Sequence, residues 1–198
     1  MDQSRLIAQA LGAIPGIVVA GVGIKQFGEG KEKSLGETKK DLVPAIETVK
    51  EHAPELYVAT NKEDILKGDL TKFQKFLVKT IHAKSMGQIF EGNNAAYVPL
   101  KNTSMIISPK MVNKSVIGHE IGHHVDAQKK QFRLLDQFIN SKKEQRAWEL
   151  SPFQGEKDKT VSDIMLNTYK GGDKIFLGTV AATVGALAAP LVLKALKR

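Results

Sequence analysis

The chain has 198 residues, enough for one ordinary domain with some additional length. It contains no cysteine, which excludes disulfide frameworks, thiolate metal sites and cysteine nucleophiles, so any metal ion must be held by histidine, aspartate or glutamate. The net charge is +8, but basic residues are interspersed with acidic ones and only 6% of residues are aromatic. This pattern is not typical of nucleic-acid binding, and we expect no nucleic-acid partner.

Residues 1–25 are expected to form an apolar segment apart from the rest of the chain. Residues 6–24 carry no charge, and five of them are glycine or proline. They favour a second membrane span or a re-entrant segment, and two alternatives stay open: a soluble apolar segment and a signal peptide. The signal peptide is disfavoured because the chain opens with Asp2, has only Arg5 as a basic residue there, and shows no clear cleavage site.

Residues 26–173 are expected to form one α+β domain. Apolar residues three to four positions apart predict helices over 38–52 and 69–83. Short apolar or alternating runs bounded by polar and turn-forming residues predict strands. These strands are expected within 55–60, 93–100 and 103–109.

A helix over residues 111–130 contains the chain's main concentration of histidine. His119 and His123 continue the stripe that Val112 and Val116 begin, so both imidazoles are expected on the interior side of an amphipathic helix. The following helical region, up to about residue 150, is expected to be interrupted near Asn140 and Ser141.

The spacing His-Glu-x-x-His at 119–123 meets the geometric needs of zinc chemistry. Residues four apart lie one turn apart on the same helical face, so His119 and His123 can bind one ion. Glu120 then lies beside the open position of the metal, where it can accept a proton from water. We therefore expect His119 and His123 to be metal ligands and Glu120 to be the general base.

The residues HEIGHH, with the small Gly122 before the second histidine, resemble the active-site helix of the zincin metallopeptidases. The resemblance implies a zincin-like fold in which a strand before this helix pairs with extended substrate, here 93–100 or 103–109. In the gluzincin branch a glutamate on a later helix, often in Glu-x-x-Ala, is the third ligand. The run EQRAW at 144–148 is similar, which implies Glu144 as ligand. Small membrane-bound zinc endopeptidases share this pattern and have flanking membrane spans.

The likeness departs at Trp148, where the family has aspartate or asparagine, a residue that usually orients a metal-binding histidine. Glu149 is an alternative third ligand, but two residues five apart on a helix diverge by about 140°. Glu144 also follows Ser141 at capping-box spacing, which would commit its carboxylate to the helix end. We favour Glu144 because the small Ala147 one turn later allows this helix to approach the zinc helix closely.

Four further residues are candidates for supporting roles. His82 and Tyr97 could stabilise a developing oxyanion, as a histidine or tyrosine commonly does in zincins. His124 points about 100° away from His123 and is expected on the surface or around the ligands. Asp126 is expected to hydrogen-bond a histidine or a helix neighbour instead of binding metal.

Residues 174–198 are expected to form a C-terminal transmembrane anchor with a basic tail. The nineteen residues 175–193 carry no charge, asparagine or glutamine. As a helix they would span about 28 Å, close to the roughly 30 Å hydrocarbon core of a bilayer. The alternative is a buried core helix.

These features predict a membrane-anchored, zinc-dependent metalloendopeptidase that hydrolyses protein or peptide substrates with one Zn²⁺ per chain. His119, His123 and Glu144 would bind zinc, and Glu120 would activate the attacking water. The alternative is a non-catalytic, zincin-like structural component of a membrane or phage virion assembly, in which partner molecules hold the apolar ends and the protein is virion-associated.

Overall fold

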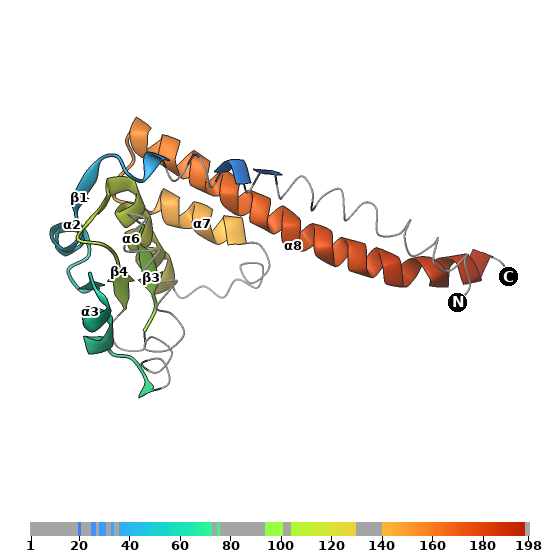
Figure 1. Ribbon diagram of the computed structural model, residues 1–198, viewed down its shortest axis with the longest axis horizontal. Coiled ribbons are helices and arrows are strands. Elements are labelled where there is room, and N and C mark those ends of the chain that lie inside the picture. Colours follow the sequence, from blue (N-terminus) through green and yellow to red (C-terminus); the bar gives the residue numbers. More distant parts are fainter. Residues whose placement is uncertain are drawn as a thin grey trace.

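The described residues form helices and two small sheets, so the predicted α+β class is confirmed. The computed structural model describes residues 20, 25–26, 28–30, 33, 36–72, 75, 94–100, 104–129 and 140–196. The strands and shorter helices gather at one end of the molecule, and the long helix α8 projects away from them (Figure 1).

The sheets are built from short strands. β1 (Leu42–Pro44) pairs antiparallel with β5 (Met111–Asn113). In the second sheet the order is β2-β4-β3, with β2 (Tyr57–Ala59) parallel and β3 (Ala96–Val98) antiparallel to the central β4 (Met105–Ile107). All three predicted strands are present, each shorter than expected.

Successive side chains of β4 point to opposite faces of its sheet and enter two different cores. Ile106 joins the cluster built with α2 and α6, while Met105 and Ile107 join a smaller cluster with Ile65 of α3 (Lys62–Lys67). Helices therefore cover both faces of this sheet. The helix predicted over 69–83 lies largely outside the described residues.

The helix predicted from residue 38 begins only at Ala45, so its first turns were predicted wrongly. α2 is Ala45–His52, and the residues before it pair with β5 as β1. Pro44 explains the difference, because a proline disfavours helical geometry at the residue before it, here Val43. Pro44 is itself extended, with φ −65° and ψ 120°, and stands at the N-cap of α2.

α6 (Lys114–Gln128) is the central helix of the molecule. It starts three residues later than predicted because residues 111–113 form β5. Val116, Ile117 and Ile121 are buried in the larger core together with residues of α2 and β4. The buried side of α6 thus holds the helix firmly against the rest of the domain.

α7 is Asn140–Glu149 and packs closely against α6. The residues on the other side of the predicted break near Asn140 lie outside the described part of the chain. A Cβ atom placed on Gly122 would lie 1.9 Å from the backbone oxygen of Ala147. Only a glycine allows this approach, so Gly122 and the small Ala147 together set the distance between the two helices.

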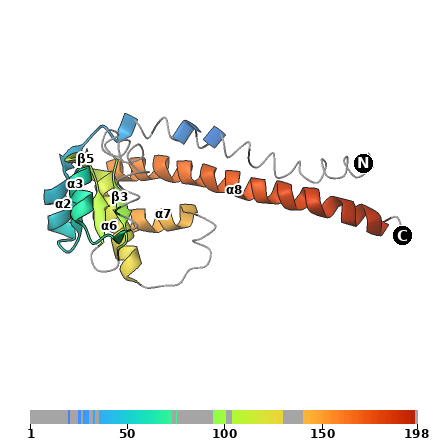
Figure 2. The same cartoon turned by 60° about the horizontal axis from the view of Figure 1, so that its bottom comes forward.

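α8 (Glu156–Leu196) is one continuous helix of 41 residues, about 60 Å long. The boundary predicted between residues 173 and 174 falls inside it. Among the described residues it is the one helix long and apolar enough to cross a membrane, and only 11% of its apolar window is buried. Described N-terminal residues lie alongside it in both ribbon views (Figure 2).

Candidate metal centre

The start of α6 is fixed by Asn113, which therefore positions the histidines further along the helix. Its side-chain oxygen accepts hydrogen bonds from the backbone N–H groups of Ser115 and Val116 at 2.9 and 3.1 Å, a typical N-cap. Its side-chain nitrogen donates to the backbone oxygens of Glu37 and Lys40 at 3.2 and 2.7 Å. One buried asparagine thus anchors α6 to the chain preceding β1.

The structure brings His119 and His123 of α6 together with Glu144 of α7. The Nε2 atoms of the two histidines lie 2.9 and 3.1 Å from the same carboxylate oxygen, Oε2 of Glu144. All three residues are buried, and their ligand atoms lie within 4.8 Å of one another. This group could hold a metal ion.

The pKa of Glu144 reflects these neighbours. Burial acts to raise the pKa, but the hydrogen bonds from His119 and His123 outweigh it and lower the pKa to about 2. The carboxylate is therefore ionised at neutral pH, the form in which it can bind a cation.

Glu120 is the next residue on α6 and is also buried. Its Oε2 accepts a hydrogen bond from the backbone N–H of Tyr97 on β3 at 2.6 Å. Burial raises the pKa of Glu120, and the neighbouring His119, His123 and the Tyr97 N–H oppose that rise. A carboxylate with a raised pKa accepts a proton more readily than an exposed one does.

Glu149, the alternative third ligand, is not part of this candidate metal-binding group. Its side chain is exposed and accepts a hydrogen bond from Gln145 at 2.8 Å. The capping-box interpretation of Glu144 also fails, because its carboxylate faces the histidines, and the amides of Asn140 and Ser141 donate to Asp173 of α8 instead.

Trp148 occupies the position where the related pattern has a carboxylate or amide. Its ring stacks on His119 with centroids 4.3 Å apart and an interplanar angle of 28°. Within the described part of the chain, the buried Nδ1 of His119 and Nε1 of Trp148 have no hydrogen-bond partner. The orientation of His119 is therefore supported by ring stacking, where an acceptor for Nδ1 would be expected.

The supporting residues fall in different places. His124 is buried, and its Nε2 lies 2.6 Å from a carboxylate oxygen of Glu55, so of the two positions expected for it the surface one is excluded. Asp126 forms an ion pair at 3.1 Å with Arg146, which links α6 to α7. His82 lies outside the described residues.

Tyr97 contacts the residues of the site through its ring and its backbone. Its hydroxyl donates to Ser104 at 3.0 Å, which engages the group expected to face an oxyanion. The ring stacks near His123, with centroids 6.4 Å apart and an angle of 16°, and meets His124 edge-on. The backbone N–H of Tyr97, which no sequence pattern singles out, is the group that contacts Glu120.

Two residues of α8 complete the surroundings and were missed from the sequence. Tyr169 is partly buried beside Glu144, and burial together with the carboxylates of Glu144 and Glu120 raises the pKa of its phenol far above the ordinary value. Asp173 is buried and accepts the first two amides of α7. Their spacing of four places them on one face of α8, but only the packing of α8 against α7 reveals that this face meets the site.

Comparison with known proteins yields no match, whether with family models, with curated proteins or with solved structures. The case for a function therefore depends on the geometry of these residues.

Proposed function

We propose that this protein is a membrane-anchored, zinc-dependent metalloendopeptidase. The observation that carries the proposal is the convergence of two imidazole nitrogens and one carboxylate oxygen within 4.8 Å, directly beside a buried glutamate. His119, His123 and Glu144 come from two helices that Gly122 allows to touch. A buried charged cluster of this kind is costly unless its members are paired or hold an ion.

The donor set fits zinc better than harder cations. Neutral imidazoles with one carboxylate suit Zn²⁺ in a site with three protein ligands and one open position. Calcium and magnesium favour sites built mainly from oxygen ligands. Zinc held by these three residues would polarise a peptide carbonyl and lower the pKa of water.

Glu120 would act as the general base of the reaction. It adjoins His119 in the sequence, is buried, and has a raised pKa that suits proton transfer. The Tyr97 N–H holds its carboxylate in place at 2.6 Å. After taking a proton from the attacking water, Glu120 could deliver it to the leaving amine.

β3 would be the strand that pairs with extended substrate. β4 is central in its sheet, so both of its edges are used, whereas β3 lies at an edge. The N–H of Tyr97 on β3 is directed to Glu120, which places this edge next to the proposed base. Addition of a strand at such an edge is a common mode of peptide binding.

The test separates catalysis from metal binding. Glu120→Gln keeps the size and hydrogen bonding of the side chain but removes the base, so it should retain zinc and cleave an unfolded soluble protein at least about 100-fold more slowly. Glu149→Gln is the matched control, because Glu149 is exposed and outside the site; it should behave as the wild type.

Two measurements are needed for each protein: zinc content by elemental analysis, and the cleavage rate. His119→Ala should lose both zinc and cleavage. Purified wild-type protein without zinc, or equal rates for wild type and Glu120→Gln, would contradict the proposal and favour a non-catalytic component.

A further inference from the structure

A single helix connects the metal-binding group to the apolar segment. α8 packs against α7, the helix that carries Glu144, and continues without a break to Leu196. An anchor joined to a catalytic domain by a flexible linker would let the site reach many heights above a membrane. A helix that is part of the site fixes that height instead.

The contact between α7 and α8 is specific. Asp173, only 9% exposed, accepts the amides of Asn140 and Ser141 at 2.9 Å each and so caps α7 from the side. One turn earlier on α8, Tyr169 contacts Glu144. Since residue 140 lies beside 173 and residue 144 beside 169, the two helices run antiparallel at this point.

Described N-terminal residues hold the same stretch of α8 through polar contacts. Gln26 accepts a hydrogen bond from the Lys174 ammonium at 2.6 Å and donates to Asn167. A Cβ on Gly30 would lie 2.1 Å from the hydroxyl of Thr168, so this segment also lies directly against the helix.

These contacts lie on both sides of the position in this part of α8 where the helix would bend most easily. Gly171 and Gly172 are adjacent and would favour a kink in an isolated helix. Thr168 and Tyr169 are held before the pair, and Asp173 is held after it. Because α8 is held on both sides of the glycine pair, its axis stays fixed between the site and the apolar segment.

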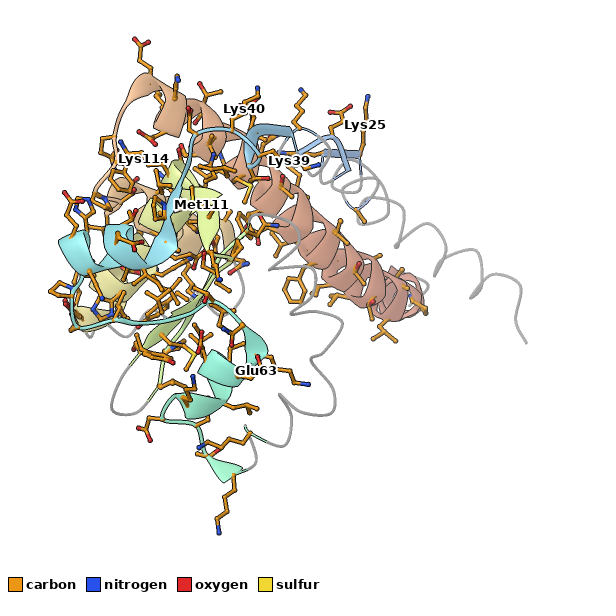
Figure 3. All side chains as sticks on the ribbon, turned by 60° about the vertical axis from the view of Figure 1, so that its left-hand side comes forward. Lys25, Lys39, Lys40, Glu63, Met111 and Lys114 are labelled. Carbon is orange, nitrogen blue, oxygen red and sulfur yellow. The ribbon has the colours of Figure 1, made fainter. Side chains whose placement is uncertain are left out.

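The apolar surface begins immediately after these contacts. Phe176 and Leu177 are 47% and 45% exposed, and exposure rises to 67% at Leu187. Basic residues gather just before it: Lys170 and Lys25 are exposed, and the Lys25 side chain extends from the segment beside α8 (Figure 3). Basic side chains followed by an apolar helix are typical of a membrane interface.

The distance along α8 then sets the height of the site. Ile175 follows Tyr169 by six positions, which corresponds to about 9 Å of helix. The headgroup region adds about 5–8 Å on each side of the hydrocarbon core. Glu144 would therefore lie just outside the headgroups when the apolar segment is in a bilayer.

We infer that α8 acts as a rigid spacer, so that the site cleaves polypeptide within about 10 Å of the membrane surface, in the juxtamembrane segments of membrane-anchored substrates. This inference rests on the proposed function. Its geometric part is independent of activity, because the height of the site can be measured directly.

Trp148 is the only tryptophan in the chain and stacks on His119, so its fluorescence reports the height of the site. In phosphatidylcholine vesicles, headgroup spin-labelled lipid should quench Trp148, and lipid brominated deep in the acyl chains should not. A seven-residue helical insertion after Lys174, matched by one before Lys25 so that an anchor at either end of the chain is displaced equally, raises the site by about 10 Å and nearly preserves its rotation. It should reduce headgroup quenching at least twofold.

Cleavage is then measured on a vesicle-anchored peptide with a uniform unfolded stretch outside the membrane. An extended chain covers about 3.3–3.6 Å per residue, so wild-type protein should cut mainly within about three residues of the membrane surface. The inserted variant should cut about three residues further out. The same seven residues added after Arg198 form the control and should leave the cut unshifted.

A soluble unfolded protein is digested in parallel. Equal cleavage of the soluble protein by both forms would support the proposed function. The spacer inference is nevertheless overturned if the anchored peptide is cut at every height, or if the cut stays in place in the inserted variant although its headgroup quenching falls. If the wild type cuts neither substrate, the proposed function fails and the inference falls with it.

Discussion

Two regions of this molecule depart from the usual pattern of burial in opposite ways: one buries charged side chains, and the other exposes apolar ones. At the junction of α6 and α7, the side chains of His119, His123 and Glu144 are buried, with exposures of 3–9%. Along the second half of α8, large apolar side chains are exposed, up to 67% at Leu187. In water each arrangement is unfavourable, the first because charge is desolvated and the second because apolar area is hydrated.

The two regions differ in how far contacts within the chain offset this unfavourable free energy. The histidines and Glu144 pair with one another, so the buried cluster is partly satisfied before any ion binds. The apolar window of α8 is only 11% buried, which leaves its surface to whatever surrounds it. The comparison suggests an ion for the first region and a lipid environment for the second.

The largest effect is expected from removing the apolar region, which should abolish membrane association. Deletion of residues 175–198 leaves Asp173 and its cap in place, and should move the protein from the membrane fraction to the soluble one while zinc binding is retained. The measurement is fractionation after a carbonate wash. Full-length protein that is soluble without detergent would contradict the span, and a deleted form that stays with membranes would transfer the anchor to the N-terminal segment.

Separating the two helices should damage the buried region most. Gly122→Ala places a methyl group 1.9 Å from a backbone oxygen of α7 and should destabilise the protein by about 3 kcal/mol. Gly36→Ala is the control, because a Cβ there meets nothing within 4 Å. Denaturant unfolding of the two variants measures the difference, and equal stabilities would show that α6 and α7 do not approach as described.

The low pKa of Glu144 predicts a pH dependence in chelator-treated protein. Because this pKa is lowered from its ordinary value near 4.5 to about 2 in the folded state, its stabilisation is present above about pH 4.5 and is lost as pH falls toward 2. Between pH 5 and pH 3 the unfolding free energy of wild type should fall about 2 kcal/mol more than that of Glu144→Gln. Parallel curves would mean that the histidines do not lower this pKa.

Glu144→Ala should weaken zinc binding at least about tenfold, about 1.4 kcal/mol, because it removes a ligand. Glu149→Ala, five residues along the same chain, should change it little, since this side chain is exposed. Competition with a chromogenic chelator gives both affinities. The reverse result would assign the ligand role to Glu149.

The smallest loss of stability is expected for a substitution at Asp173, which lies between the buried cluster and the apolar part of α8. Asp173→Asn keeps one acceptor for the first amides of α7 but loses the second and the charge, and should cost about 1 kcal/mol of stability. Asp163→Asn, at an exposed position of the same helix, should be neutral. A neutral Asp173→Asn would show that α8 does not hold α7.

Local patterns in the sequence were sufficient to predict several features of the site. The spacing of His119 and His123 put both rings on one helical face because the helix repeat is local geometry. Ala147 indicated a close helix approach. The choice between Glu144 and Glu149 depended on which side of α7 faces α6, and the sequence could only favour one.

Other features required contacts between residues far apart in the chain. The start of α6 at Lys114 depends on the pairing of β5 with β1, which lies far earlier in the chain. The angle of His124 on the helix left open a surface position or one around the ligands, yet its Nε2 lies 2.6 Å from the carboxylate of Glu55, 69 residues earlier. Such partners carry no local signature.

The sequence by itself determined the types of the candidate ligands, their spacing on one helix, and the presence of an uncharged segment long enough for a bilayer, since each follows from composition and a local repeat. Only the tertiary structure decided that Glu144 meets both histidines, that stacking by Trp148 supports His119, and that Asp173 joins α7 to the helix carrying the apolar segment. These contacts depend on how helices pack, and packing depends on the shapes of surfaces brought together from distant parts of the chain.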